Sequence, residues 1–239
     1  MKTWAIGDVH GCGITLQSLL HRLGPGQGDH VIFLGDIIDR GKTMQHAWKA
    51  IQDLQKSKVQ VTLLRGNHED ALLNALEEEK NPPKRKLFKK NIPIALNTWK
   101  SFGGTEVLKS FSASKPGDLP ADFLEFIASS RFYLEEEKFM LVHAGFNFKH
   151  EPFYEDVQSM MWLREFDVDL AKTGGRRVLH GHVPVSLDLI RQTLEQTAFH
   201  FIDLDNGCVY RDRSGMGNLV ALDLDTETLH IQPNIEPYQ

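Results

Sequence analysis

The sequence predicts an α/β fold, and three observations support this class. Residues 3–79 alternate short apolar runs with amphipathic helical patterns, which is typical of a parallel sheet with crossover helices. Strand-like runs return after residue 130 and continue almost to the C-terminus. Polar motifs follow several apolar runs directly, at the edge where open α/β sheets place their ligand sites. We therefore expect these motifs to form one site.

The N-terminal part is expected to contain three strand–helix units. Short apolar runs predict buried strands, and each is followed by apolar residues at helical spacing. The strands are expected at 3–7, 30–35 and 59–64, and the helices at about 16–23, 43–55 and 69–79. The connections are short, which favours parallel strands with right-handed crossovers.

The pattern changes between residues 80 and 129. This segment contains Pro82-Pro83, Gly103-Gly104 and several helical stretches, but no obvious strand. We interpret it as a helical insertion or cap on a single catalytic domain that spans 1–239. Its basic run at 80–90 is expected to be a solvated helix face, with steering of acidic substrates as the alternative. The run contains Lys80, Lys84, Arg85, Lys86, Lys89 and Lys90.

The C-terminal part is expected to be mostly antiparallel sheet. Apolar runs at 132–134 and 139–142 predict a hairpin. Asp205-Asn206-Gly207 predicts a turn between two later strands. Further strands are expected at 177–179, 187–190, 198–203, 209–210, 219–224 and 229–231.

Composition limits the cellular setting. The chain has 239 residues, of which 41% are apolar, and a net charge of −5, so neither nucleic acid nor an anionic membrane is an expected partner. Cys12 and Cys208 are the only cysteines, which argues against a disulfide framework. The sequence contains no run of about 20 apolar residues and no signal-peptide pattern after Met1. We expect a soluble, cytoplasmic protein.

Six side chains just past apolar runs are candidate metal ligands. They combine carboxylate, imidazole and amide groups without thiolates, a set that suits Mn, Fe or Zn. Six donors exceed what one ion needs, and a shared Asp36 would let them hold two. A two-metal centre generates hydroxide near neutral pH and clamps the oxygens of an in-line phosphoryl displacement. The six are Asp8, His10, Asp36, Asn67, His143 and His182.

Other charged residues in these motifs suit phosphate chemistry. Arg40, Arg65 and Arg164 carry guanidinium groups that can hold phosphate oxygens with two hydrogen bonds. His68 follows the candidate ligand Asn67 and could protonate a leaving oxygen, with Asp39 orienting it and stabilising its charged form. Glu69 is expected to cap the next helix or to support the ligands, but not to bind metal.

Five motifs in order resemble the phosphoprotein phosphatase family of calcineurin-like metallophosphoesterases. They run from residue 7 to residue 184, and the strand-rich C-terminal part is also similar. The motifs are Gly-Asp-Val-His-Gly, Gly-Asp-Ile-Ile-Asp-Arg-Gly, Gly-Asn-His-Glu, Val-His-Ala-Gly and Gly-His-Val-Pro. The resemblance implies two mixed β-sheets packed as a sandwich and flanked by helices, with the metals at the sheet edge.

The resemblance also implies roles for the candidate residues. Asp8, His10 and Asp36 would hold the first metal, and Asp36, Asn67, His143 and His182 the second, with Mn²⁺ expected and Fe or Zn as alternatives. His68 with Asp39 would be the general acid pair, and Arg40 and Arg65 would bind phosphate. Arg164, in Trp162-Leu163-Arg164, resembles a further phosphate-binding arginine of bacteriophage and bacterial members. A hydroxide that bridges the metals would attack phosphorus in line.

Two branches of this family compete as models for the substrate. One contains serine/threonine protein phosphatases, some of which accept phosphotyrosine, and the other contains symmetrical diadenosine tetraphosphate hydrolases. The stretch from Leu64 to Glu69 resembles the phosphatases, because the dinucleotide hydrolases more often lack the arginine at Arg65 and carry Asp in place of Glu69. We therefore expect a protein phosphatase that acts on a phosphorylated protein or peptide, with a dinucleoside polyphosphate as the alternative substrate.

Overall fold

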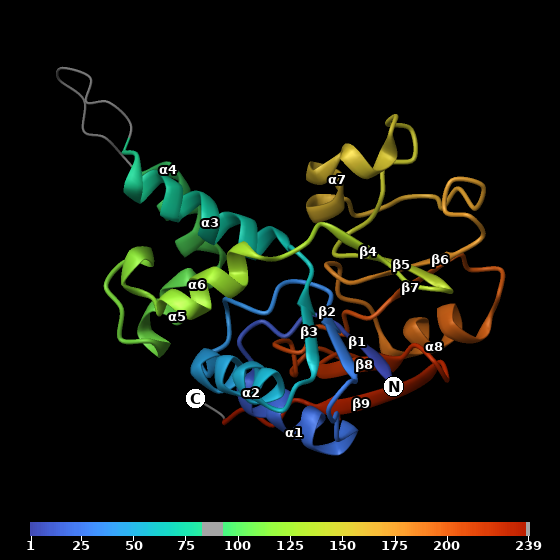
Figure 1. The fold of residues 1–239 in the computed structure, drawn as a ribbon, viewed down its shortest axis with the longest axis horizontal. Helices are drawn as coiled ribbons and strands as arrows, with labels where there is room; N and C mark the ends of the chain where they lie inside the picture. The colour runs from blue at the N-terminus through green and yellow to red at the C-terminus, as the bar shows by residue number, and fades with distance from the viewer. Residues whose placement is uncertain (83–92, 238–239) are drawn as a thin grey trace.

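The strands of the described chain form two mixed sheets, with helices on the outside (Figure 1). This is a computed structural model, and it describes residues 1–82 and 93–237. One sheet has the order β3-β2-β1-β8-β9 and the other β4-β5-β6-β7. The strands are β1 (Thr3–Ile6), β2 (His30–Phe33), β3 (Gln60–Leu63), β4 (Tyr133–Glu135), β5 (Phe139–Val142), β6 (Arg177–His180), β7 (Phe201–Asp203), β8 (Asn218–Asp223) and β9 (Thr228–Pro233). The expected fold class is confirmed.

The first sheet joins the two ends of the chain. Strands β1, β2 and β3 pair in parallel, as the strand–helix pattern predicts, whereas β8 and β9 add to β1 in antiparallel fashion. Helices α1 (Gly13–Leu23) and α2 (Met44–Lys56) connect the parallel strands. Gly24 ends α1 in a left-handed conformation (φ 63°), which glycine adopts without steric strain.

The second sheet corrects two expectations for the C-terminal part. Its strands β5, β6 and β7 are parallel, and only β4 pairs antiparallel, so a mostly antiparallel arrangement is wrong here. Residues 187–190 form part of helix α8 (Leu187–Glu195) rather than a strand. Ser186 caps this helix by accepting a hydrogen bond from the Leu189 N–H. A short apolar run alone does not distinguish the two structures.

The segment between β7 and β8 also differs from the prediction. No strand covers residues 209–210, and Asp205-Asn206-Gly207 lies in a long loop rather than in a hairpin turn. Asn206 organises this loop, since its amide donates to the carbonyls of Val185 and Gly215 and accepts from the Asn218 N–H. Asn206 is therefore suited to this position because it pairs with these carbonyls, and not because it forms a tight turn.

Apolar side chains from both sheets pack against one another. Ala5, Ile32 and Leu222 of the first sheet belong to the same fully buried cluster as Leu141 and Leu179 of the second. This shared core holds the two sheets face to face, so polar residues beyond the strand ends of both sheets meet at one edge.

The described residues of 80–129 form helices and no strand. They are the end of α3 (Asn67–Lys80), then α4 (Ile94–Trp99), the π-helix η1 (Lys100–Gly104), α5 (Thr105–Ser110), the 3₁₀-helix η2 (Pro116–Asp118) and α6 (Ala121–Ala128). Most of the basic run at 80–90 lies outside the described residues. No helix in the described ranges is both long and apolar enough to cross a membrane, and the cellular compartment stays a prediction.

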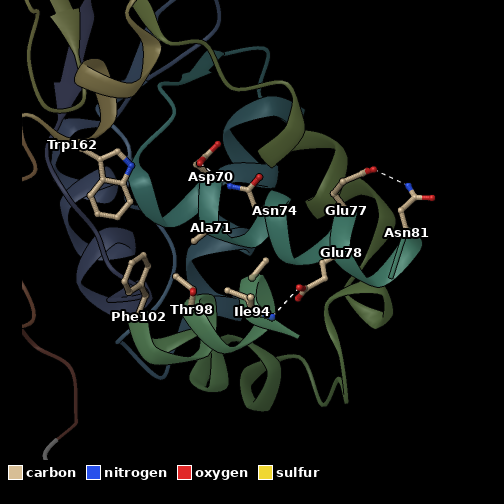
Figure 2. A pocket seen from close by; sticks show the side chains of 11 residues that line it. Asp70, Ala71, Asn74, Glu77, Glu78, Asn81, Ile94, Thr98, Phe102 and Trp162 are labelled. Atoms are coloured by element: carbon tan, nitrogen blue, oxygen red, sulfur yellow. Dashed lines mark hydrogen bonds between the residues drawn. The ribbon is translucent and has the colours of Figure 1, made fainter. Parts of the chain in front are cut away.

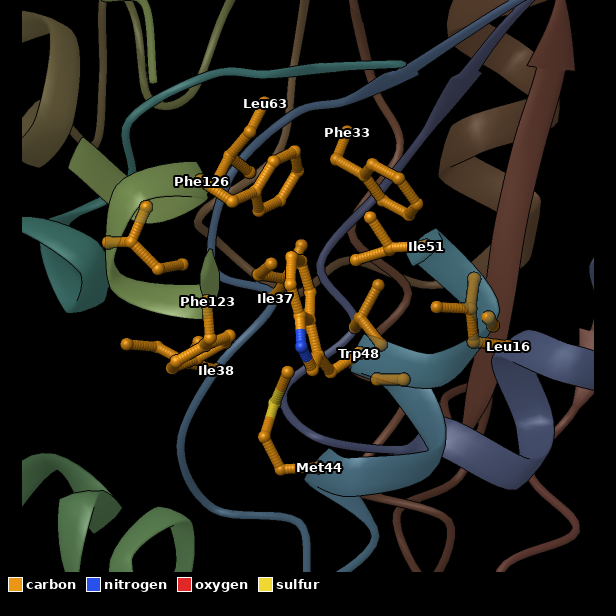
Figure 3. Close-up of a cluster of buried hydrophobic side chains, with 14 of the residues drawn as sticks. Leu16, Phe33, Ile37, Ile38, Met44, Trp48, Ile51, Leu63, Phe123 and Phe126 are labelled. Carbon is orange, nitrogen blue, oxygen red and sulfur yellow. The ribbon is translucent and has the colours of Figure 1, made fainter. Parts of the chain in front are cut away.

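Aromatic contacts fix this helical insertion to α2. The Trp48 ring lies 5.4 Å from Phe123 and 5.4 Å from Phe126 of α6. Figure 3 shows these rings beside Ile37 and Ile38, which belong to the loop after β2. The insertion therefore shares one core with the loop that carries the site.

We expect Trp48→Ala to lower the free energy of unfolding by about 3–5 kcal/mol, because it leaves a cavity between α2 and α6. Urea denaturation monitored by circular dichroism measures this change. The control is Lys49→Ala on the exposed face of α2, which removes a surface ion pair with Asp53 and should change stability little. A Trp48→Ala loss as small as that of the control would contradict the role of this contact.

Candidate metal centre

The six expected metal ligands meet where strands of both sheets end. Five are buried and His182 is partly buried. They follow β1, β2, β3, β5 and β6, and the expected convergence of strand ends is therefore present. The six are Asp8, His10, Asp36, Asn67, His143 and His182.

Asp36 lies between two groups of candidate ligands. Its Oδ2 is 3.7 Å from His10 Nε2, which is itself 4.0 Å from Asp8 Oδ2. Its Oδ1 is 3.5 Å from His143 Nε2, which lies 3.1 Å from His182 Nδ1. The two oxygens of one carboxylate thus face different histidine groups, as a bridging ligand requires.

The hydrogen bonds of the histidines leave lone pairs directed at this centre. The Nδ1 atoms of His10 and His143 lie 3.1 and 2.9 Å from the carbonyl oxygens of Ile38 and Leu34, so each donates its proton there. The Nε2 lone pair of His143 then faces Asn67 Oδ1 at 3.2 Å, another acceptor. A cation between these atoms would satisfy both.

Burial keeps these rings in the neutral form that binds metal. It lowers the pKa of His10 and of His143, and it lowers the pKa of His182 to about 3 with help from nearby His143. Neutral imidazole is the ligand form. The buried His/Asp clusters are therefore consistent with a dinuclear metal site. The individual ligand assignments stay predictions.

The backbone at the ligands is held in an unusual conformation. His10, Asp36 and His182 have φ values of 45°, 46° and 76°, in the left-handed region that non-glycine residues rarely adopt. Such strain persists where the surrounding structure imposes it, and it is common at functional sites.

Glu69 imposes part of this geometry. Its carboxylate accepts hydrogen bonds from the backbone N–H groups of Asp36, Ile37 and Gly66, at 2.8, 2.9 and 3.0 Å. Burial raises the pKa of Glu69 to about 8. A Cβ at Gly66 would lie 2.1 Å from Asp36 Oδ1, so only glycine fits there. Glu69 thus caps α3 and supports Asp36, which agrees with the supporting role expected for it.

His68 is aligned by a buried pair of hydrogen bonds. Its Nδ1 is 2.7 Å from Asp39 Oδ2, and Asp39 Oδ1 accepts a hydrogen bond from Trp99 Nε1 at 3.0 Å. Burial opposes the charged ring, but the carboxylates of Asp36 and Asp39 outweigh it and raise the pKa of His68. The ring is therefore suited to donate a proton, and the assignment of His68 as general acid stays a prediction.

Trp99 has no counterpart among the expected site residues. It lies at the end of α4, 60 residues from Asp39 in sequence, and no motif surrounds it. Only the docking of the insertion brings the indole N–H to Asp39. Its burial could be guessed from sequence, but its partner could not.

The three expected phosphate-binding arginines occupy different surroundings. Arg40 lies at the centre, with Nη2 3.1 Å from His68 Nε2 and Nη1 donating to the Tyr210 hydroxyl at 3.1 Å. Arg164 is close enough to His182 to lower its pKa. Arg65 donates from Nε to Ser130 Oγ and from Nη2 to the Ala128 carbonyl, and it stacks on Phe132. Phosphate binding by all three stays a prediction.

Comparison with known proteins agrees with the site. Residues 1–208 match the family model described as calcineurin-like phosphoesterase, and the chain belongs to this family. It is a metallophosphoesterase hydrolase. The expected resemblance is therefore confirmed at the level of the family.

Two relatives are named as enzymes that act on dinucleoside tetraphosphates. The chain is 28% identical to the bis(5'-nucleosyl)-tetraphosphatase PrpE [asymmetrical] of Oceanobacillus iheyensis, over 89% of this chain and 86% of the relative. It is 36% identical to the symmetrical bis(5'-nucleosyl)-tetraphosphatase of Escherichia coli, over 36% of this chain and 31% of that protein. These matches favour the alternative substrate class over the protein phosphatase first expected.

Solved structures show the same fold at low sequence identity. A protein serine/threonine phosphatase from Saccharomyces cerevisiae aligns with a TM-score of 0.65 and 13% identity, over 100% of this chain and 82% of that one. A cold-active protein-tyrosine phosphatase of a Shewanella species aligns with a TM-score of 0.58 and 15% identity, over 97% and 80%. At this identity the likeness supports the fold alone.

We expect Asp36→Asn to reduce the number of Mn²⁺ ions bound per chain from two and to abolish hydrolysis, because the bridging charge is lost. Isothermal titration of the metal-free protein measures the stoichiometry. Asp53→Asn, which changes an exposed carboxylate on α2, should bind metal as the unmodified chain does. Unchanged stoichiometry and affinity in Asp36→Asn would argue against the bridge.

Trp99→Phe should slow hydrolysis of alkyl phosphates by about fivefold, because the loss of one hydrogen bond to Asp39 loosens the alignment of His68. Aryl phosphates should be affected less, since their leaving groups need less protonation. Steady-state kinetics on both classes provides the comparison, and Trp4→Phe is the control for loss of a buried indole away from the site. Equal losses on both classes would mean that Trp99 acts only through stability.

Proposed function

We propose that this chain hydrolyses dinucleoside polyphosphates. The observation that carries the proposal is the likeness to a bis(5'-nucleosyl)-tetraphosphatase at 28% identity along 89% of the chain. The protein phosphatases share the fold, but at 13–15% identity they do not favour their own substrate class.

The two residues that favoured the phosphatase branch have local structural partners. Glu69 accepts three backbone N–H groups around Asp36 and therefore has a structural task whatever the substrate is. Arg65 directs two of its nitrogens at Ser130 and at the Ala128 carbonyl, where it ties the end of the insertion to the loop after β3. Both residues are accounted for without a phosphoprotein.

Cationic groups extend outward from the centre, which suits a chain of phosphates. Arg40 donates to the Tyr210 hydroxyl, and the guanidinium of Arg213 lies 4.1 Å from the ring of Tyr210. Arg164 lies near His182. A polyphosphate carries charge along its length, and these arginines can neutralise oxygens beyond the phosphorus under attack.

The residues of the chain have distinct tasks in such a reaction. Divalent ions held by the six ligands would activate water and polarise the phosphoryl oxygens. Arg40 binds and orients the phosphoryl group beside His68. His68, when doubly protonated, donates from Nε2 to the leaving oxygen, while Asp39 accepts from Nδ1 and Trp99 holds Asp39 in place. A nucleotide leaving group needs this proton less than an alkoxide does, since it is the weaker base.

A phosphoprotein phosphatase is the second candidate function. It is supported by the sequence from Leu64 to Glu69, with its arginine and glutamate, and by the aligned Asp39–His68 pair, which suits a poor leaving group. The metal centre alone does not separate these two functions, because both reactions are attacks on phosphorus. The difference must come from groups that bind the remainder of the substrate.

We expect the Mn²⁺-loaded protein to hydrolyse diadenosine tetraphosphate with a kcat/KM about tenfold or more above that for a phosphoserine or phosphothreonine peptide, because discrimination follows the fit of the whole substrate. Chromatography identifies the products. Two ADP, or ATP with AMP, support the proposal and show which phosphorus is attacked. Asp36→Asn, prepared in parallel, reveals any contaminating hydrolase. Faster release of phosphate from the peptide would overturn the proposal in favour of the second candidate.

A further inference from the structure

A pocket opens between α3 and α4, and its end beside the candidate metal centre is formed by Phe102 and by Trp162 of helix α7 (Val157–Trp162). Its volume is about 660 Å³, within the range of small-molecule sites. Trp162 and Phe102 stand at one end of it, Asn74 lies on the α3 side, and Ile94 and Thr98 come from α4 (Figure 2). The pocket therefore has an aromatic end and a polar side.

The aromatic end belongs to the pocket and to the metal centre at once. The centroid of the Phe102 ring is 5.2 Å from that of His68, and the centroid of Trp162 is 6.4 Å from that of His182. A group that lies on these rings is thus next to the phosphoryl site. Trp162 is 38% exposed, so a ligand can reach its ring.

We propose that this pocket binds the adenine base of a dinucleoside polyphosphate by stacking on Trp162 and Phe102. The inference rests on the function proposed above and names the part of the protein that recognises the nucleoside. The two rings are 5.8 Å apart and inclined by 58°, so they form an angled wall and not a parallel-sided slot. A base stacks on the face of such a wall, and each base–aromatic stack contributes about 1–3 kcal/mol.

The charge distribution separates the base from the phosphates. Glu77 and Glu78 line the pocket away from the aromatic end (Figure 2), and these acidic side chains repel phosphate groups. Arginines flank the metal centre instead, at Arg40 and Arg164. A substrate with a neutral base and an anionic chain therefore binds in one orientation, with its base in the pocket and its phosphates at the metals.

Asn74 gives the pocket a preference among bases. Its Nδ2 donates to Asp70 Oδ2 at 2.9 Å, within one turn of α3. This bond uses one hydrogen of the amide nitrogen and leaves the amide oxygen free to accept a hydrogen bond from a ligand. Adenine presents an amino donor where hypoxanthine and guanine present a carbonyl acceptor. The pocket should therefore favour adenine.

The main test compares a substrate that has bases with one that lacks them. Trp162→Ala should lower the ratio of kcat/KM for diadenosine tetraphosphate to that for inorganic tripolyphosphate by about tenfold, mainly through KM, because a stacking contact is lost. Trp162→Phe should retain most of the ratio. Tyr154→Ala removes an exposed aromatic residue that does not line the pocket, and it should leave both rates unchanged. An unchanged ratio in Trp162→Ala would overturn the inference.

A second measurement examines the polar side. The unmodified chain should prefer diadenosine over diinosine tetraphosphate, and Asn74→Leu should bring this preference close to one. The same preference in Asn74→Leu would exclude Asn74 as the group that reads the base.

Binding of adenosine distinguishes failure of the pocket from failure of the proposed function. Adenosine has no phosphate, so it reports on the pocket alone, and isothermal titration calorimetry measures its affinity for each variant. If diadenosine tetraphosphate is not a substrate but adenosine binds, and binds more weakly to Trp162→Ala and Asn74→Leu, the pocket remains a nucleoside site and only the function is wrong. If adenosine does not bind, the pocket assignment is wrong even when the dinucleotide is hydrolysed.

Discussion

The carboxylate of Glu69 holds together the backbone on which the site depends. It accepts N–H groups from the end of the loop after β3 and from the loop after β2, and so fixes Asp36 relative to the start of α3. Asn67 and His68 begin that helix. Asp36, Asn67 and the candidate general acid His68 thus share a single anchor. Loss of this anchor would disturb all three together, because Glu69 is bonded to the backbone of both loops.

The helices between residues 94 and 128 pack into the candidate site and do more than cover it. Trp48 attaches α6 to α2, and the same insertion sends the indole of Trp99 to Asp39. Phe102, one turn later, contacts His68. Packing of the insertion is therefore coupled to the alignment of the candidate acid, and a substrate that binds against the insertion can influence that alignment directly.

Much of the site could be predicted from the sequence because each candidate ligand lies just past a strand in a short local motif. The periodicity of nearby residues was enough to place Asp8, His10 and Asp36 at one sheet edge. Trp99, Phe102 and Trp162 could not be placed, because their partners lie far away in sequence and only the tertiary packing unites them. The prediction of a strand at residues 187–190 was wrong for a different reason. Ser186 caps a helix there, and the short apolar run alone did not indicate it.

The two sheets contribute unequally and separately to the candidate centre. Asp8, His10, Asp36 and Asn67 extend from the first sheet, whereas His143 and His182 extend from the second. Ions shared by these groups would be reversible cross-links between halves of the fold that are separated by about 100 residues of chain. In chain-entropy terms a link across a loop of that length can stabilise a folded protein by about 4–5 kcal/mol. Metal supply would then govern how long the protein survives in the cell as well as how fast it works.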